Sequence, residues 1–309
     1  MENQDTLFER SCEFILSAYP DWRLTDLRVA GAGLEFLVCS AVSEPWGPIA
    51  IKTPWERWIS NDNDPHIDAR DLLRQEATIT MHLRRYGVAL PAVYKLHLDD
   101  DGLDFLVSEF MESDESLPDM FELGRLMRDI HRQPVPQLSL VACDQKPLNA
   151  VLAERTARRL KVAATLAEVD LPNLRPADIE AILDSHVVER PSLLHMDARP
   201  ANLLTRQGSI LGLIDWSNAL IGDVGLELAR IAEYGYLDEA FLRGYGQADG
   251  FAHLPRPIEL VYRLDTAVML AVVFLSEAPD PKLADAQVKR VRELSHLLDG
   301  HRLRGQENT

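Results

Sequence analysis

Apolar and polar residues follow a strand-like spacing in the first third of the chain. Short apolar or alternating runs predict β-strands over 24–29, 35–42 and 48–53, and then a hairpin of strands at 93–98 and 103–108. Residues 68–86 have instead the spacing of an amphipathic helix, and Gly87 is a typical helix stop. The pattern predicts an antiparallel sheet with one helix in this part.

Helical spacing predominates after residue 109. Helices are predicted over 119–132, 150–169, 176–186 and most of 226–297, with two short strands at 203–205 and 210–214. We therefore expect an α+β fold of two lobes, residues 1–110 and 111–309. A ligand cleft is expected where the lobes meet, near residues 109–114.

Composition narrows the setting in which such a protein works. Of the 309 residues, 46% are hydrophobic and 26% are charged, as in ordinary globular proteins. No apolar run is long enough to cross a membrane, the start lacks the pattern of a secretory signal, and the three cysteines form no disulfide framework. We expect a cytoplasmic protein without a membrane partner, either a monomer or a homodimer.

The formal charge of −17 bears on the choice of partners. An acidic chain repels the phosphate backbone, so nucleic acid is not expected as a partner. A cationic ligand would be attracted, although a need for solubility explains the same charge equally well.

The strongest chemical signal lies between residues 195 and 216. The run His-Met-Asp197-Ala-Arg199-Pro-Ala-Asn202 is followed thirteen residues later by Asp215, at the end of an apolar strand. Asn202 and Asp215 offer the hard oxygen ligands that Mg²⁺ prefers, and a short hairpin between them would return the second ligand beside the first. Asp197 is a candidate base for a hydroxyl group, and Arg199 is a candidate cation for a phosphate.

This spacing resembles the catalytic and metal-binding loops of eukaryotic-type kinases. With Pro200 in the loop, Ile-Asp-Trp at 214–216 and Glu-Leu-Ala at 227–229, the sequence is similar to the aminoglycoside phosphotransferase family, which includes choline-, sugar- and macrolide-kinase relatives. The resemblance implies a bilobal protein-kinase-like fold and Mg²⁺-dependent transfer of the γ-phosphate of ATP to a small-molecule hydroxyl. GTP is not excluded as the donor.

The resemblance also assigns roles around the loop. Arg199 stands where the family commonly has histidine, and a guanidinium preserves the cationic role by gripping phosphate oxygens. Glu227 corresponds to an acid that stabilises the helical lobe. His195 is expected to brace the loop by hydrogen bonds rather than to take part in the chemistry.

Glu76 would share a helix face with Leu72, Ile79 and Leu83, which should point inward. A buried charge without a partner costs about 3–5 kcal/mol, so Glu76 requires a cation. Lys52, on the preceding strand, is the evident candidate, and in kinases such a pair positions the lysine on the α- and β-phosphates. The alternative is that both side chains simply reach solvent.

Two further segments complete the predicted nucleotide site. Gly31 and Gly33 would form a turn over the phosphates, although a plain hairpin turn explains them nearly as well. Glu109, Phe110 and Met111 fall where such kinases have their inter-lobe hinge, whose backbone groups bind adenine. An ordinary strand end is the alternative there.

The acceptor is less well defined by the sequence. Only six residues separate Asp215 from Gly222, and the Asp-Phe-Gly and Ala-Pro-Glu signatures are absent where a protein kinase has them, so a protein substrate is disfavoured. Between residues 223 and 285, five bases oppose eleven acids, a net of 5 − 11 = −6. This charge suits an amine-bearing acceptor such as an aminoglycoside, an amino sugar or choline, whereas solvated helix faces explain most of these acids without any ligand.

Other interpretations differ in acceptor or in class. Four aromatic residues would instead floor an apolar pocket, as for a macrolide: Tyr234, Tyr236, Tyr245 and Phe251. A regulatory nucleotide-binding module without catalysis is a second class, against which the complete set of catalytic candidates argues. A metal hydrolase built on His195 and Asp197 lacks further ligands at a usable spacing.

Overall fold

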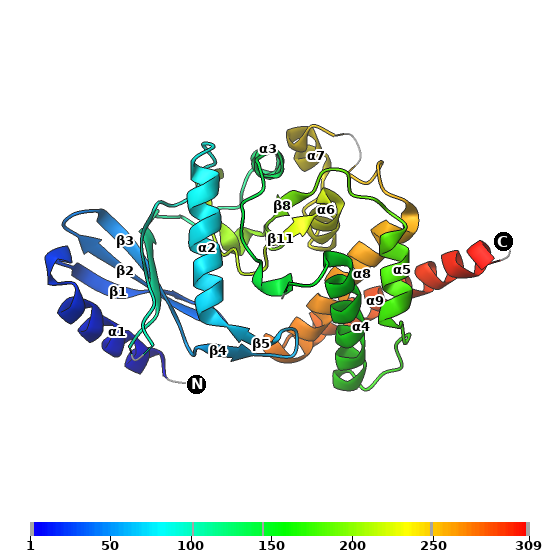
Figure 1. The fold of residues 1–309 in the computed structure, drawn as a ribbon, viewed down its shortest axis with the longest axis horizontal. Helices are drawn as coiled ribbons and strands as arrows, with labels where there is room; N and C mark the ends of the chain where they lie inside the picture. The colour runs from blue at the N-terminus through cyan, green and yellow to red at the C-terminus, as the bar shows by residue number, and fades with distance from the viewer. Residues whose placement is uncertain (1–2, 101, 144, 248–249, 307–309) are drawn as a thin grey trace. The chain divides into compact units, whose positions relative to one another are not determined.

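The computed structural model describes residues 3–100, 102–143, 145–247 and 250–306. It divides the chain into two compact units, each of which is made from several stretches of sequence (Figure 1). Unit 1 comprises Met1–Ser60, His66–Asp119 and Pro200–Ser217, and unit 2 comprises Asn61–Pro65, Met120–Arg199 and Asn218–Thr309. The chain therefore passes between the units within the predicted catalytic region, between Arg199 and Pro200.

Unit 1 is built on a five-stranded antiparallel sheet in the order β1-β2-β3-β7-β6. The strands are β1 (Thr25–Ala32), β2 (Phe36–Ser43), β3 (Gly47–Pro54), β6 (Val93–His97) and β7 (Phe105–Glu109). All five were predicted from the apolar runs. In the register, Lys52 lies between Val38 of β2 and Leu106 of β7, in the middle of the sheet.

Two helices cover the two faces of this sheet, as Figure 1 shows. The helix α2 (Ala69–Arg84) was predicted, and it is N-capped by the side chain of Asp68. The helix α1 (Gln4–Ala18) was not predicted from the sequence. It buries Leu7 and Ile15 in one core with Ile49 and Ile51 of β3. Because alternate residues of a strand point to opposite faces, Lys52 is directed to the face that α2 covers.

The remainder of unit 1 is a small hairpin and the segment that holds it. The strands β9 (Leu203–Arg206) and β10 (Ser209–Leu213) pair after a single turn, η3 (Pro200–Asn202). Residues 112–119 run along this hairpin: the Asp114 amide donates to the Thr205 carbonyl at 2.9 Å, and the Asp119 amide donates to the Gly208 carbonyl at 2.9 Å. The segment that follows β7 is thereby fixed to the hairpin. Unit 1 also contains η1 (Pro20–Trp22) and the strand β4 (Trp58–Ser60), which pairs with β5 (Pro65–Asp68).

Unit 2 is mainly helical. Its α-helices are α3 (Met120–His131), α4 (Leu148–Leu166), α5 (Pro176–Asp184), α6 (Val224–Glu233), α7 (Glu239–Tyr245), α8 (Arg256–Val272) and α9 (Pro281–Gln306). The unit also contains the short 3-10 helix η2 (Val141–Cys143) and the π-helix η4 (Val273–Glu277). Two short strands that were not predicted, β8 (Ser192–Leu194) and β11 (Leu220–Gly222), pair on either side of the catalytic region. Most of α8 is buried, so this helix forms the centre of the unit's core.

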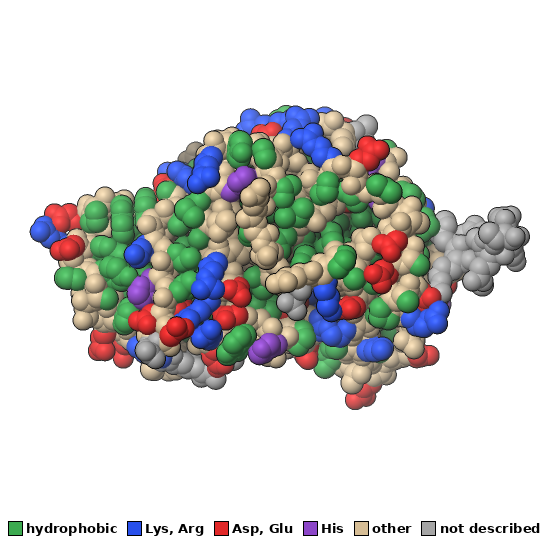
Figure 2. All heavy atoms as spheres, viewed as in Figure 1, with side chains coloured by type: hydrophobic (Ala, Val, Ile, Leu, Met, Phe, Trp, Pro, Cys, Tyr) green, Lys and Arg blue, Asp and Glu red, His purple; other side chains and the backbone are tan. Residues whose placement is uncertain are grey.

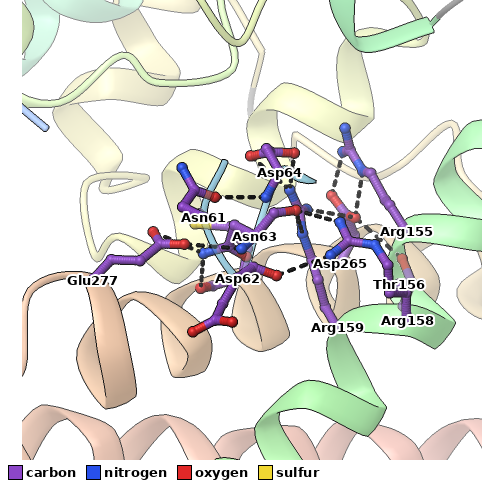
Figure 3. A network of polar contacts seen from close by, with 11 residues as sticks. Asn61, Asp62, Asn63, Asp64, Arg155, Thr156, Arg158, Arg159, Asp265 and Glu277 are labelled. Atoms are coloured by element: carbon purple, nitrogen blue, oxygen red, sulfur yellow. Dashed lines mark hydrogen bonds and ion pairs between the residues drawn. The ribbon is translucent and has the colours of Figure 1, made fainter. Parts of the chain in front are cut away.

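A short polar segment from the β4–β5 hairpin belongs to unit 2. Figure 3 shows it among charged side chains of α4, α8 and η4. The side chain of Asn63 donates to Glu277 at 3.1 Å, and Arg159 pairs with Asp64 at 3.2 Å. The segment is thus bound by specific polar contacts. Among the residues that the structure describes, no helix is both long enough and apolar enough to cross a membrane.

Candidate functional site

Lys52, Glu76 and Asp215 come together in unit 1. The Nζ atom of Lys52 lies 2.6 Å from Oε2 of Glu76 and 3.2 Å from Oδ1 of Asp215. The side chains of Lys52 and Glu76 are 15% and 12% exposed, so the pair is largely withdrawn from solvent. The ion pair predicted from the helix face of Glu76 is therefore present, and Asp215 extends it.

The electrostatics of this group keep Lys52 charged. Burial acts to lower the pKa of Lys52, but the carboxylates of Asp215 and Glu76 outweigh it and raise the pKa above its ordinary value. The ammonium also lies 4.4 Å from the centroid of the Phe36 ring, a cation–π contact. A fixed positive charge at this position is suited to polyphosphate.

Asn202 and Asp215 stand at the two open ends of the β9–β10 hairpin. The backbone amide of Ile214 donates to the carbonyl of Asn202 at 3.0 Å, so the hairpin returns Asp215 beside the residue predicted as its partner. Asp215 has a φ of +67°, a left-handed conformation that aspartate tolerates better than most residues, and the Ser217 hydroxyl donates to its Oδ1 at 2.7 Å.

This donor set fits a particular kind of metal site. One amide oxygen and one carboxylate are hard donors of the type that Mg²⁺ accepts. Among the described residues, no group of three or more His, Cys, Asp or Glu side chains is arranged to hold a metal. A pair of protein ligands is what Mg²⁺ uses when nucleotide phosphates and waters supply the remaining oxygens, so the residues present fit this ion.

The glycine turn and the predicted hinge also lie in unit 1. A Cβ atom added to Gly31 would meet no atom within 4 Å, so the protein's own packing leaves open space there. The Gly33 amide is already used, as it donates to the Phe36 carbonyl at 2.9 Å. At the hinge, the Glu109 and Phe110 amides donate to the carbonyls of Ala92 and Pro48, at 2.7 and 3.1 Å, and are likewise used within the sheet.

Asp197 and Arg199 lie in unit 2, where a tyrosine also holds Asp197. The Tyr234 hydroxyl donates to Oδ1 of Asp197 at 2.6 Å, and Nε of Arg199 lies 3.1 Å from Oδ2. The side chain of Asp197 is 12% exposed, whereas that of Arg199 is 49% exposed. The carboxylate is therefore fixed in orientation by two donors.

The loop that carries Asp197 is braced from beneath by Glu227 of α6. Glu227 is fully buried, and it accepts the backbone amides of His195 at 2.8 Å and Met196 at 2.6 Å. Burial acts to raise the pKa of Glu227, but the hydrogen bond and charge of His131, whose Nε2 lies 2.9 Å away, outweigh it and lower the pKa. His195 accepts the Asp197 amide on Nδ1 at 3.1 Å, which is a bracing contact within the loop. Both contacts agree with the structural roles that the resemblance implied.

The sequence did not reveal the contact of Tyr234 with Asp197, and for Tyr234 the floor of an apolar pocket was considered only as an alternative. A signal was present, because Glu227 and Tyr234 are seven residues apart and so share one face of a helix. His131 was also missed. It precedes Glu227 by almost a hundred residues, and no local pattern connects the two.

The acids of the helical tail are mostly used inside unit 2. Glu233 pairs with Arg263 at 2.8 Å and Arg290 at 2.9 Å, and Asp265 is bound by Arg155. Others with partners or capping roles are Asp223, Glu227, Asp238, Glu239, Glu259, Glu277 and Asp280. Figure 2 shows one face of the whole molecule, on which basic side chains lie close to acidic ones. The net charge of the tail is therefore weak support for a cationic acceptor.

The structure thus gathers the predicted residues into two groups. Unit 1 contains the nucleotide and metal candidates, and unit 2 contains Asp197 and Arg199 on their braced loop. Their catalytic, nucleotide-binding and metal-binding roles stay predictions.

Solved structures establish the fold. The GDP complex of a single-residue mutant of aminoglycoside 2'-phosphotransferase-IIIa matches with a TM-score of 0.61 at 16% identity, over 95% of this chain and 99% of that one. Aminoglycoside phosphotransferase APH(4)-Ia matches with a TM-score of 0.65 at 15% identity, over 93% of this chain and 97% of that one. A candidate fructosamine-3-kinase from Haemophilus somnus matches with 0.64 at 13% identity, also over 93% and 97%. The predicted kinase-like α+β fold is confirmed.

Sequence comparison establishes the family. No curated protein matches the sequence. The model of a family described as "Phosphotransferase enzyme family", however, matches residues 39–260, which is well over half of the chain and includes every predicted site residue except the glycine turn. The predicted resemblance is thereby confirmed. The chain therefore belongs to the phosphotransferase enzyme family, whose members transfer phosphate groups.

Proposed function

We propose that the protein transfers the γ-phosphate of ATP to a hydroxyl group of a small molecule in a Mg²⁺-dependent reaction. The observation that carries this proposal is the state of Asp197. Its carboxylate is nearly buried, and two donors, Tyr234 and Arg199, fix it in one orientation. A general base needs to be held within hydrogen-bond reach of the proton that it removes, and a carboxylate on a braced loop meets this requirement.

Each of the chain's own residues has a role in the proposal. Asp197 orients the acceptor hydroxyl and takes its proton as the acceptor oxygen bonds to the γ-phosphorus, while the bond from that phosphorus to the β–γ bridging oxygen breaks and ADP leaves. Lys52, held between Glu76 and Asp215, binds the α- and β-phosphates, and Arg199 offsets the charge of the group in transfer. The open space above Gly31 admits the phosphates, and the backbone of Met111 binds adenine, because the two preceding amides are already used.

Asn202 and Asp215 would hold the metal ion together with the nucleotide phosphates. Mg²⁺ bound there would neutralise phosphate charge in the transition state. In this proposal residues 1–110, with Met111 directly after them, bind the nucleotide, and residues 111–309 supply the catalytic loop, the metal ligands and the acceptor pocket. The enzyme would act in the cytoplasm as a monomer or a homodimer.

The names of the structural neighbours guide the choice of acceptor. A variant of APH(4)-Ia was solved with AMP-PNP and hygromycin B, and another neighbour is described as a fructosamine kinase. Aminoglycosides and fructosamines are both polyhydroxy compounds that bear an amine. We therefore propose an amine-bearing sugar-like acceptor first. Macrolides, simple sugars and choline-like alcohols follow as alternatives.

The test is a screen for acceptor-dependent ADP or GDP release with aminoglycosides, amino sugars, macrolides and choline-like alcohols. The wild type is expected to turn over at least one of them only with Mg²⁺. Asp197→Ala should lose transfer, by about 10²–10⁴-fold for the base alone, while nucleotide affinity is retained. Normal turnover by Asp197→Ala would exclude the proposed base. Mg²⁺-dependent nucleotide binding without turnover of any acceptor would favour the non-catalytic regulatory alternative.

A further inference from the structure

One face of α6 carries three polar side chains in a row, and two of them hold the loop of Asp197. Glu227, Arg230 and Tyr234 follow the i, i+3, i+7 spacing that places side chains on a single helix face. Glu227 accepts two amides of the loop, and Tyr234 donates to Asp197 itself. Arg230 therefore stands between two anchors of the loop, on the face that covers it.

Arg230 is buried without a partner of its own. Only 4% of the residue is exposed. Its Nε atom is fully buried and has no hydrogen-bond partner, and within the described part of the chain no carboxylate lies at ion-pair distance from its guanidinium. Buried arginines are almost always paired, because a buried donor or charge left alone is costly. The position therefore requires an explanation.

The acids whose charges act on Arg230 already have other donors. Asp265 is held by two guanidinium nitrogens of Arg155 and by the Thr156 hydroxyl at 3.1 Å (Figure 3). Asp64 is held by Arg159. Asp197 has its two donors, described above. Burial acts to lower the pKa of Arg230, but Tyr234, Asp265 and Asp197 outweigh it and raise the pKa. These groups keep the guanidinium charged from beyond hydrogen-bond distance.

We propose that Arg230 binds an anionic group of the acceptor, a carboxylate or a phosphate, beside the hydroxyl that Asp197 deprotonates. A guanidinium presents several donors in one plane and binds such groups through paired hydrogen bonds. This proposal rests on the proposed function, because it assigns the anionic group to the acceptor that the enzyme phosphorylates. It changes the expected substrate from a purely cationic compound to one that carries a negative charge near the reacting hydroxyl.

Binding is tested without any need for turnover. Wild type, Arg230→Gln and Arg230→Lys are saturated with Mg²⁺ and AMP-PNP, so that the nucleotide site is occupied. The shift in Tm is then measured with glucosamine, with muramic acid, which adds a carboxylate, with glucosamine 1-phosphate and with inorganic phosphate. The wild type should be stabilised by one or both of the anionic sugars more than by glucosamine, and Arg230→Gln should lose this difference. Arg230→Lys should retain part of it.

Folding of the variants provides an independent readout. If Arg230 serves a ligand rather than the fold, Arg230→Gln without ligand should melt within about 4 °C of the wild type. Arg175→Gln, at the exposed N-cap position of α5, is the matched control and should leave every anion effect unchanged. Where turnover is found, kcat/KM for the anionic acceptor should fall about 10- to 100-fold in Arg230→Gln, with little change for glucosamine.

The outcomes separate this proposal from the proposed function. Equal stabilisation of wild type and Arg230→Gln by every anion would overturn the anion site even if the enzyme turns over an acceptor. The anion site would also be overturned if glucosamine raised the Tm of the wild type more than both anionic sugars do. A large fall in the Tm of both Arg230 variants without ligand would overturn it too, because Arg230 would then serve the fold. A response to muramic acid indicates a carboxylate, and a response to glucosamine 1-phosphate indicates a phosphate. A response to inorganic phosphate alone indicates that the site takes free phosphate and contradicts the assignment to the acceptor.

Discussion

Glu227 holds Met196 in a conformation that the chain would not adopt unaided. Met196 has a φ of +65°, in the left-handed region that non-glycine residues rarely occupy, and its amide donates to Oε1 of Glu227 at 2.6 Å. The residue is fully buried and directly precedes Asp197. The strain is therefore located where it sets the direction of the predicted base.

Replacing Glu227 by Gln should affect catalysis more than nucleotide binding. The amide side chain has one acceptor oxygen where the carboxylate has two, so one of the two loop amides would be left without its bond. A buried donor left unsatisfied costs about 1–3 kcal/mol. Urea unfolding should show this loss, and kcat should fall while the Kd of ATP stays near the wild-type value. An unchanged kcat would show that the brace does not set the catalytic geometry.

Asp265 should make the stability of unit 2 dependent on acidic pH. Burial acts to raise the pKa of Asp265, but Arg155 and Arg159 outweigh it and lower the pKa to about 2 from 3.8. Because the folded-state pKa is depressed, the stabilisation is present above about pH 4 and is lost as the pH falls through about 2. The shift corresponds to stabilisation on the order of 2 kcal/mol.

Asp265→Asn is the variant that tests this dependence. At neutral pH it should lose about 3–5 kcal/mol of unfolding free energy, because Arg155 and Arg159 are left buried without their carboxylate. The difference from the wild type should narrow as the pH is lowered from about 4 to about 2. Glu239→Gln, in an exposed pair with Arg243, should show neither effect. A difference that stays constant with pH would contradict the depressed pKa.

Much of the local structure and of the site could be predicted because its signals are short-range. The strands of the sheet, α2 and the β9–β10 hairpin each have a strong period and a turn or stop residue at the end. The pairing of Lys52 with Glu76 followed from a single carboxylate on an apolar helix face, whose burial required a cation. These inferences needed only the neighbouring sequence.

What could not be predicted depends on contacts between distant parts of the chain. The helix α1 has a polar first turn, and its Leu7 and Ile15 gain meaning only from the sheet that they cover. The brace from His131 to Glu227 joins residues 96 positions apart. The acids of the tail gave a misleading net charge, because a count of charges does not reveal which ones are paired inside the fold.

Lys52→Met should weaken nucleotide binding, and it should also lower the free energy of unfolding by about 3–5 kcal/mol because the largely buried Glu76 loses its cation. The substitution removes the cation proposed for the α- and β-phosphates and leaves Glu76 and Asp215 facing one another without it. Isothermal titration with ATP and with GTP in Mg²⁺ should show at least a roughly tenfold rise in Kd, since charged hydrogen bonds contribute about 1.5–3 kcal/mol. Lys95→Met, at an exposed position of the edge strand β6, should bind like the wild type. Equal Kd values for the two variants would remove Lys52 from the nucleotide site.

Gly124→Ala should destabilise unit 2, although alanine is ordinarily the better helix former by about 1 kcal/mol. The helices α3 and α7 cross with their backbones almost in contact at two glycines. A Cβ atom at Gly124 would lie 2.0 Å from the Phe241 carbonyl oxygen, and one at Gly244 would lie 2.0 Å from that of Phe121. Because backbone has to move in either case, each substitution should cost at least about 1–3 kcal/mol in urea unfolding. In Gly31→Ala the added Cβ atom would have no other atom within 4 Å, so this control should not change the unfolding free energy by a comparable amount. If Gly124→Ala were neutral or stabilising, the close crossing of α3 and α7 would be wrong.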